Sequence, residues 1–194
     1  MTQADKPTTV YFVRHAKSDT RMRDDRDRPL TPEGLKDAAC VADCFKDIPV
    51  DHIYSSPYRR AWQTMTELAA LKGLDIQPDE RFRERRSAGW HPFFLEHMRQ
   101  LWSNGNYSGP GEENLRMVQK RNIEALNEIL ESHSGQTIVI GSHGTALSTV
   151  IHAYNPDFDY DDFIRIKDVM PWMVRFIFRG KQCLEVEEIP PFNG

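Results

Sequence analysis

An arginine and a histidine follow directly on the first apolar run of this chain. Residues 10–13 read Val-Tyr-Phe-Val, a composition typical of a buried strand, and Arg14 and His15 come next. Burying a cation and an imidazole without partners costs roughly several kcal/mol, so this pair is not expected in the interior of a buried strand. We therefore expect Arg14 and His15 to belong to a functional site.

Two further predicted strands end in residues of the same kind. Residues 137–140 read Thr-Ile-Val-Ile and lead to His143, while residues 52–55 lead into a helix that carries Arg59 in its first turn. In an open parallel sheet, functional groups gather beyond the carboxyl ends of the strands. The two histidines should therefore converge with Arg14 and Arg59, whereas we expect the neighbouring Arg60 to face solvent.

This combination of side chains is suited to phosphoryl chemistry. Arginine binds phosphate oxygens in bidentate fashion, and the helix starts near Pro57 and Gly144 would add backbone donors. A neutral imidazole is a nucleophile toward phosphorus, and a second, protonated imidazole can stabilise the transferring group. An alkoxide leaving group needs a proton, for which Glu84 is the candidate donor. The alternative for Glu84 is a structural ion pair with the arginines around it.

The elements that position these residues alternate along the chain. Strands are expected at 8–13, 52–55, 75–77 and 137–140, and helices at 31–48, 56–73, 93–102, 112–131 and 144–154. Alternating residues from 174 to 179, a turn at Gly180 and a strand at 183–187 predict a hairpin. The fold class is therefore α/β: a three-layer sandwich with a mostly parallel central sheet, helices on both faces and an antiparallel edge hairpin.

Composition excludes several classes of protein. The chain has 194 residues with a net charge of −4, which does not favour nucleic-acid or membrane-surface binding, and no stretch has the length of a transmembrane span. Its three cysteines suggest no disulfide framework, so a reduced, cytoplasmic location is expected. The histidines show no metal-ligand spacing, and neither a metal nor a cofactor is expected.

Four short motifs occur in order along the chain. They are Arg14-His15-Ala16, Leu30-Thr31-Pro32-Glu33-Gly34, the run from Ser55-Ser56 to Arg59-Arg60-Ala61-Trp62-Gln63-Thr64, and His143-Gly144. Together they resemble the Arg-His-Gly, Leu-Thr-x-x-Gly, Ser-Ser-x-x-x-Arg-Ala-x-x-Thr and His-Gly motifs of the histidine phosphatase superfamily. The resemblance is to the branch of cofactor-dependent phosphoglycerate mutases and small-molecule phosphatases, and it extends from the first strand to the helix after His143.

The resemblance implies a role for each catalytic candidate. His15 would be the nucleophile that becomes phosphorylated, Arg14, Arg59 and His143 would hold the phosphate, and Glu84 would donate the proton. One domain of this kind is expected over residues 1–194, with a lid-like insertion around 85–111.

Four other residues are candidates for substrate binding. Ser18 stands at a common family position, and Arg21 replaces an asparagine that often contacts phosphate in the mutases. Arg85 and Arg86 either bind an acidic part of the substrate or are merely exposed. The chain also departs from the family pattern at Ala16, where the family has glycine, and at residues 90–92.

The resulting prediction is a metal-independent phosphoric monoester hydrolase of the histidine acid phosphatase type. It would cleave a small phosphorylated metabolite through a phosphohistidine on His15 and release inorganic phosphate. The alternatives are a cofactor-dependent phosphoglycerate mutase, a phosphatase acting on phosphohistidine in proteins, and a phosphate-binding module without turnover. No nucleic-acid or membrane partner is expected.

Overall fold

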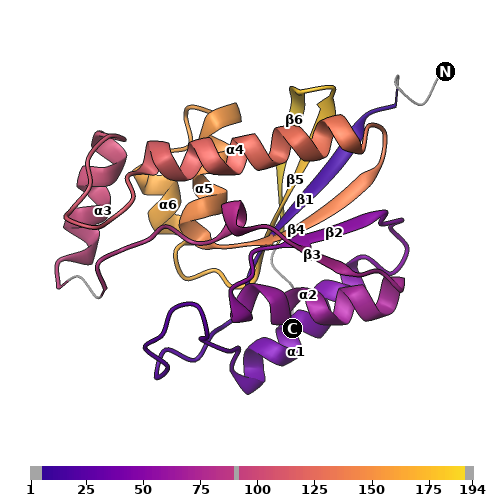
Figure 1. The fold of residues 1–194 in the computed structure, drawn as a ribbon, viewed down its shortest axis with the longest axis horizontal. Helices are drawn as coiled ribbons and strands as arrows, with labels where there is room; N and C mark the ends of the chain where they lie inside the picture. Colours follow the sequence, from indigo (N-terminus) through magenta and orange to yellow (C-terminus); the bar gives the residue numbers. More distant parts are fainter. Residues whose placement is uncertain (1–5, 90–91, 191–194) are drawn as a thin grey trace.

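A computed structural model describes residues 6–89 and 92–190 (Figure 1). Along the chain the elements are β1 (Thr8–Arg14), α1 (Pro32–Cys44), β2 (His52–Ser55), α2 (Arg59–Lys72), β3 (Ile76–Pro78), the 3-10 turn η2 (Glu80–Phe82), α3 (Phe94–Ser103), α4 (Leu115–Ser132), β4 (Thr137–Ser142), α5 (Gly144–Tyr154), α6 (Tyr160–Ile166), β5 (Trp172–Arg179) and β6 (Gln182–Ile189). Alternation of strands and helices is as the sequence predicts.

The strands form one six-stranded sheet in the order β3-β2-β4-β1-β5-β6. Neighbours from β3 to β1 pair in parallel, whereas β5 pairs antiparallel with both β1 and β6. Helices α1 and α2 lie on one side of the sheet, and α4, α5 and α6 lie on the other (Figure 1). The predicted α/β class, mostly parallel sheet and antiparallel edge hairpin are therefore confirmed.

Strand β1 separates two hydrophobic cores because its side chains alternate between the faces of the sheet. Val10 and Phe12 belong to the larger core, which the α4–α6 side covers. Tyr11 and Val13 belong to the smaller core, which also contains side chains of α1 and α2. A strand buried on both faces fixes its own register, and it therefore fixes the position of the residues that follow it.

One local prediction was wrong, and one helix was missed. Helix α2 begins at Arg59 rather than at Ser56 because the Ser56 hydroxyl accepts a hydrogen bond from the amide of Tyr58 and holds a bend before the helix. Helix α6 was not predicted at all. It begins with a capping box formed by Asp159 and Asp162, a signal hidden in a run of acidic residues.

Within the described residues, none of the helices is both long and apolar enough to cross a membrane.

Candidate active site

The parallel pairing of β1 with β4 brings the two predicted histidines together. Arg14 is the register partner of Ser142, so His15 and His143 both come directly after paired positions. The amide of His15 donates to the Ser142 carbonyl at 3.0 Å, and the two imidazole rings lie 5.2 Å apart between centroids. Both histidines are buried. The convergence inferred from the strand ends is therefore present in the structure.

The surroundings of His15 leave one ring nitrogen with a lone pair. Its Nδ1 lies 2.8 Å from the carbonyl oxygen of Ala16. Because a carbonyl can only accept, Nδ1 carries the hydrogen and Nε2 is unprotonated in the neutral ring. Burial, followed by the charges of Arg60 and Arg14, lowers the pKa of His15 well below its usual value. The imidazole is thus neutral near pH 7 and is able to act as a nucleophile through Nε2.

His143 lies beside His15 and contacts the end of β2. Its Nε2 is 2.8 Å from the Ser56 hydroxyl, whereas Nδ1 is buried without a hydrogen-bond partner among the described residues. Burial lowers the pKa of His143 well below the usual value, and the charge of Arg60 adds to the shift. An imidazole in this position is neutral until an anion binds nearby and favours its protonated form.

Arg14 is held by backbone carbonyls rather than by a carboxylate. Its terminal nitrogens donate to the carbonyls of Ile166, Lys167 and Val169 at 2.7, 2.8 and 3.0 Å, while Nε has no partner in the part of the chain described. Burial is the main reason why the pKa of Arg14 falls to about 10. A side chain at Gly144 would place its Cβ 3.0 Å from the guanidinium carbon, so the close approach requires glycine. The arginine is fixed in place and keeps its positive charge.

The second arginine of the site is Arg60, and not Arg59. Arg59 is exposed at the start of α2, whereas Arg60 is 2% exposed and contacts the main-chain oxygen and the carboxylate of Asp25. Among neighbouring charges, that of Arg60 contributes most to lowering the pKa of both His15 and His143. A signal was available in the sequence, because Arg60 is the arginine that directly precedes Ala61 in the Arg-Ala step of the motif.

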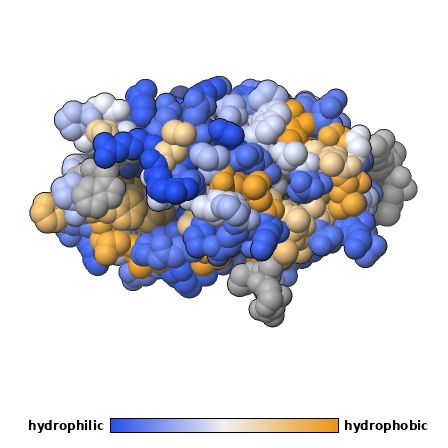
Figure 2. Space-filling view, turned by 90° about the horizontal axis from the view of Figure 1, so that it is seen from below, coloured by the Kyte–Doolittle hydropathy of each residue, from blue (hydrophilic) through white to orange (hydrophobic). Residues whose placement is uncertain are grey.

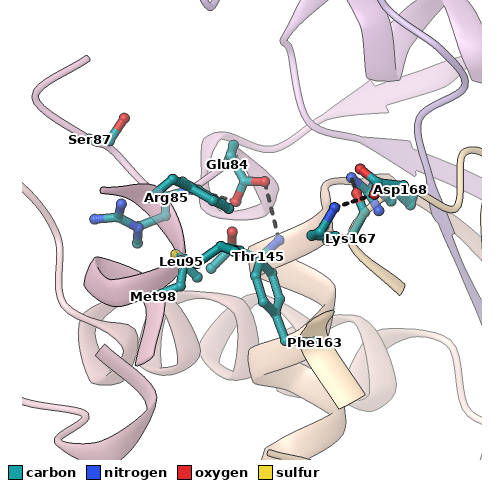
Figure 3. Close-up of a pocket in the computed structure, with 12 residues that line it drawn as sticks. Glu84, Arg85, Ser87, Leu95, Met98, Thr145, Phe163, Lys167 and Asp168 are labelled. Atoms are coloured by element: carbon teal, nitrogen blue, oxygen red, sulfur yellow. Dashed lines mark hydrogen bonds and ion pairs between the residues drawn. The ribbon is translucent and has the colours of Figure 1, made fainter. Parts of the chain in front are cut away.

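Glu84 lies in the segment after η2 and points toward the first turn of α5 (Figure 3). Its carboxylate accepts hydrogen bonds from the amides of Arg85, Thr145 and Ala146 at 2.7, 3.2 and 3.2 Å. The glutamate is therefore not paired with the arginines beside it in sequence. It is anchored to the helix that begins directly after His143.

A cavity of about 540 Å³ opens beside Glu84. Its walls come from the strand ends, α3, α6 and the segments after η2 and α6. The lining residues are Arg14, Glu84, Arg85, Ser87, Phe94, Leu95, Met98, Gly144, Thr145, Phe163, Lys167 and Asp168. In Figure 3, Arg85 and the Lys167–Asp168 pair lie on opposite sides of Glu84. Neither His15 nor His143 is in this lining, but their chain neighbours Arg14 and Gly144 are, so the cavity adjoins the histidine pair.

The four predicted substrate-binding residues have different positions. Arg85 is buried in the cavity wall, but Arg86 is exposed and donates to the Gly111 carbonyl. Arg21 is at the surface in a bidentate pair with Asp19, and Ser18 forms an isolated bridge with Leu30. The structure does not bring Arg21 or Arg86 to the cavity, because each is engaged by a local partner.

Three residues near the histidine pair were not predicted as site residues. Ser56 contacts His143, Thr64 accepts a hydrogen bond from the amide of Ala16 at 3.0 Å, and the charge of Arg28 contributes to lowering the pKa of His15. Ser56 and Thr64 stand in the motif that also contains Arg60, so their positions in that motif were a usable signal. Arg28 carried no such signal within its charge-rich loop.

The chain is similar to known proteins in both sequence and fold. A family model described as histidine phosphatase superfamily (branch 1) matches residues 10–171. A putative phosphoserine phosphatase 2 of Hydrogenobacter thermophilus is 31% identical over 155 residues, 73% of this chain and 76% of that protein. A probable phosphoglycerate mutase GpmB of Salmonella choleraesuis is 30% identical over 155 residues, 73% of this chain and 72% of that protein.

Solved structures show the same fold. YhfR of Bacillus stearothermophilus has a TM-score of 0.78 at 25% identity, covering 96% of this chain and 98% of that one. A mycobacterial glucosyl-3-phosphoglycerate phosphatase has a TM-score of 0.76 at 16% identity, covering 94% of this chain and 97% of that one. The chain belongs to the histidine phosphatase superfamily, branch 1.

Proposed function

We propose that this protein hydrolyses a phosphomonoester through a phosphohistidine on His15. The observation that supports this most directly is the neutral His15 imidazole, whose Nε2 keeps its lone pair while Arg14, Arg60 and His143 surround it. The buried guanidiniums of Arg14, which is held by uncharged carbonyls, and of Arg60 attract a phosphoryl dianion and stabilise the charge that develops during transfer.

In the first step, His15 Nε2 attacks phosphorus and the bond from phosphorus to the ester oxygen breaks. Glu84 enters this step as the carboxylic acid and gives its proton to the departing alkoxide, which leaves as an alcohol. Glu84 borders the cavity and is bonded to the first turn of the helix that follows His143, a position that suits a donor to a leaving group held in that cavity. Nε of Arg14, Nε of Arg60 and Nδ1 of His143 are buried and unpartnered among the described residues, and they are the proposed donors to the phosphoryl oxygens.

In the second step, water attacks the phosphohistidine and the bond from phosphorus to Nε2 breaks. Glu84, now a carboxylate, takes a proton from the water, so the acid of the first step is regenerated. His15 returns to its neutral form with Nδ1 still donating to the Ala16 carbonyl. Inorganic phosphate is the second product, and the cycle requires neither a metal nor a cofactor.

The proposal is tested by replacing His15 and a matched histidine outside the site. His15→Ala should lower kcat/KM for p-nitrophenyl phosphate by on the order of 10³-fold or more, because the nucleophile is removed. His133→Ala replaces a histidine at the opposite end of the strands and should leave the rate within about twofold. Equal rates for wild type and His15→Ala would overturn the proposal.

A phosphoglycerate mutase is the second candidate, and the 30% identity to a probable mutase favours it. A mutase would convert 3-phosphoglycerate into its isomer faster than it releases phosphate, and it would require a bisphosphate primer. We expect phosphate release and no isomer, measured by ³¹P NMR with and without the bisphosphate. Isomer formation that outpaces phosphate release would favour the mutase.

The other two alternatives predict different outcomes. A phosphatase acting on phosphohistidine in proteins breaks a bond to nitrogen and needs no cavity for an alcohol, whereas Glu84 borders a cavity of about 540 Å³. A binding module without turnover would be stabilised by phosphate but would release none from any ester. Sustained phosphate release from a phosphomonoester excludes the binding module.

A further inference from the structure

One wall of the cavity beside Glu84 is apolar. Leu95 and Met98 come from α3 and Phe163 comes from α6, and the three side chains lie together on one side of the cavity (Figure 3). Met98 and Phe163 are 1% and 4% exposed, whereas Leu95 is 50% exposed. Figure 2 shows hydrophobic surface at the end of the molecule that carries α3, bordered by hydrophilic residues. A leaving group placed here would cover Leu95 and gain apolar contact.

Contacts on both sides of α3 hold this wall in place. The Tyr160 hydroxyl of α6 donates to the Leu95 carbonyl at 3.3 Å, and the guanidinium of Arg99 lies 4.6 Å from the Tyr160 ring centroid. On another side, His97 Nε2 lies 2.8 Å from the carboxylate of Glu112, and both side chains are 5% exposed. The apolar wall is therefore a built part of the cavity.

The cations that line the cavity already have partners. Arg85 is 3.4 Å from the carboxylate of Glu112, and Lys167 is ion-paired with Asp168. The terminal nitrogens of Arg14 are used by backbone carbonyls, as described above. An anionic group that took Arg85 from Glu112 would leave a buried carboxylate without its arginine, because the Glu112 side chain is 5% exposed. The Asp168 side chain is 82% exposed, so its pairing with Lys167 imposes no such cost. The Arg85 side of the cavity therefore disfavours a carboxylate in the leaving group.

The size of the cavity also bears on the substrate. Its volume of about 540 Å³ lies within the range of pockets that bind organic molecules. A serine or glycerate moiety has only two carbons besides its carboxylate, and it therefore offers little apolar surface to this wall.

From these observations we infer the substrate class: phosphomonoesters whose alcohol places an apolar group of about four carbons or more against the wall formed by Leu95, Met98 and Phe163. The inference rests on the proposed function, since it assigns the cavity to the leaving group. Small acidic esters such as 3-phosphoglycerate and phosphoserine lack such an apolar group, and we expect them to bind more weakly. Leu95, at the exposed edge of the apolar wall, is the residue expected to determine this specificity.

The test uses alkylphosphonates, whose carbon–phosphorus bond is not hydrolysed, so that binding is measured without turnover. Calorimetry with ethyl-, butyl- and hexylphosphonate should show Kd falling about threefold per methylene, and roughly 50- to 100-fold from ethyl to hexyl. 2-Carboxyethylphosphonate should bind at least tenfold more weakly than butylphosphonate. A Kd that does not change along the series, or tighter binding of the carboxylate, would overturn the inference.

A pair of variants locates the effect. Leu95→Ser should reduce the hexyl-to-ethyl ratio of affinities about tenfold, because a hydroxyl replaces the apolar edge of the wall. Leu71→Ser replaces a leucine of similar exposure on α2, 46% against 50%, and should leave the ratio unchanged. An unchanged ratio in Leu95→Ser would contradict the assignment of the wall.

Hydrolysis of hexyl phosphate, measured alongside binding, separates this inference from the proposed function. A binding gradient together with hydrolysis that survives His15→Ala would refute the phosphohistidine while supporting the apolar cavity. Hydrolysis that depends on His15, together with a flat binding series, would refute the apolar cavity alone.

Discussion

Two pairs of histidines lie at opposite ends of the sheet, and they differ in what surrounds them. His15 and His143 are buried at the carboxyl ends of β1 and β4, with ring centroids 5.2 Å apart. His52 begins β2 and His133 follows α4, and their rings are 3.8 Å apart and tilted by 32°. Proximity of two imidazoles is therefore common to both ends, and it does not by itself define a catalytic site.

The difference lies in free lone pairs and in nearby positive charge. His133 Nδ1 is 3.1 Å from the Gln136 side-chain oxygen, and its Nε2 is 2.8 Å from the Tyr54 hydroxyl, so both nitrogens are engaged. The His15 ring instead has its hydrogen bond at Nδ1, and among the described residues nothing engages Nε2, which lies beside buried arginines. The comparison indicates that reactivity arises from what the surrounding side chains leave unsatisfied.

Within this comparison, we expect the largest effect on activity from the replacement of Arg60. Arg60→Ala should lower kcat/KM for a phosphomonoester by about 10³-fold, because a buried cation facing both histidines is removed. Arg59→Ala is the matched control, one residue away and exposed, and should stay within about threefold. Steady-state kinetics on both variants measures this. An equal loss of kcat/KM in the two variants would contradict the placement of Arg60 in the site.

A smaller effect, dependent on the substrate, is expected for Glu84. Glu84→Gln should lose about 100-fold more rate on an alkyl phosphate than on p-nitrophenyl phosphate, whose leaving group needs little protonation. The Thr145 and Ala146 amides donate to different oxygens of Glu84, so the glutamine keeps an acceptor for one of the two. Folding should survive this loss of one contact, and circular dichroism provides the control. Similar losses on both substrates would instead point to a structural role.

Burial of His15 and His143 should make the stability of the fold sensitive to acid. The folded-state pKa of His15 and of His143 is lowered, so the unfolded chain binds more protons below about pH 6.5 and stability falls as pH falls. We expect a loss of about 1 kcal/mol per pH unit for each imidazole below that pH. Urea unfolding at pH 7 and 5.5 should show that the free energy of unfolding falls less in His15→Asn than in the wild type. An equal fall in both would contradict the burial of a neutral His15.

The smallest effect concerns the other end of the sheet. Tyr54→Phe removes the hydroxyl that contacts His133 and should lower the free energy of unfolding by about 1 kcal/mol. Activity should be unchanged, because this contact is remote from His15. A loss of activity larger than about threefold would show that the two ends are coupled, and the comparison would then need revision.

The meeting of His15 with His143 was predictable, because parallel strands place their carboxyl ends at one edge of the sheet. The choice between Arg59 and Arg60 depends on which side chain the start of α2 buries, and the contact of Arg60 with Asp25 comes from a distant loop. Motif position alone would have selected Arg60. The fold class was likewise predictable, since alternation of strands and helices is a local property of the sequence.

Other features of the site required the tertiary structure. The contacts of Arg14 with the carbonyls at the end of α6 join residues more than 150 positions apart, as in the bond to Ile166. Arg85 and Arg86 are adjacent and chemically identical, yet only Arg85 is paired with Glu112 in the cavity wall. No periodicity or composition distinguishes two such neighbours.

The central claim is that phosphate passes through His15, and trapping the intermediate tests it most directly. Wild-type protein is mixed with a ³²P-labelled phosphomonoester, quenched in alkali within milliseconds, and digested for peptide mapping. We predict an alkali-stable, acid-labile phosphohistidine on the peptide that contains His15, and none in His15→Ala. Turnover without any labelled protein, or label on His143 or on a hydroxyl side chain, would contradict this account.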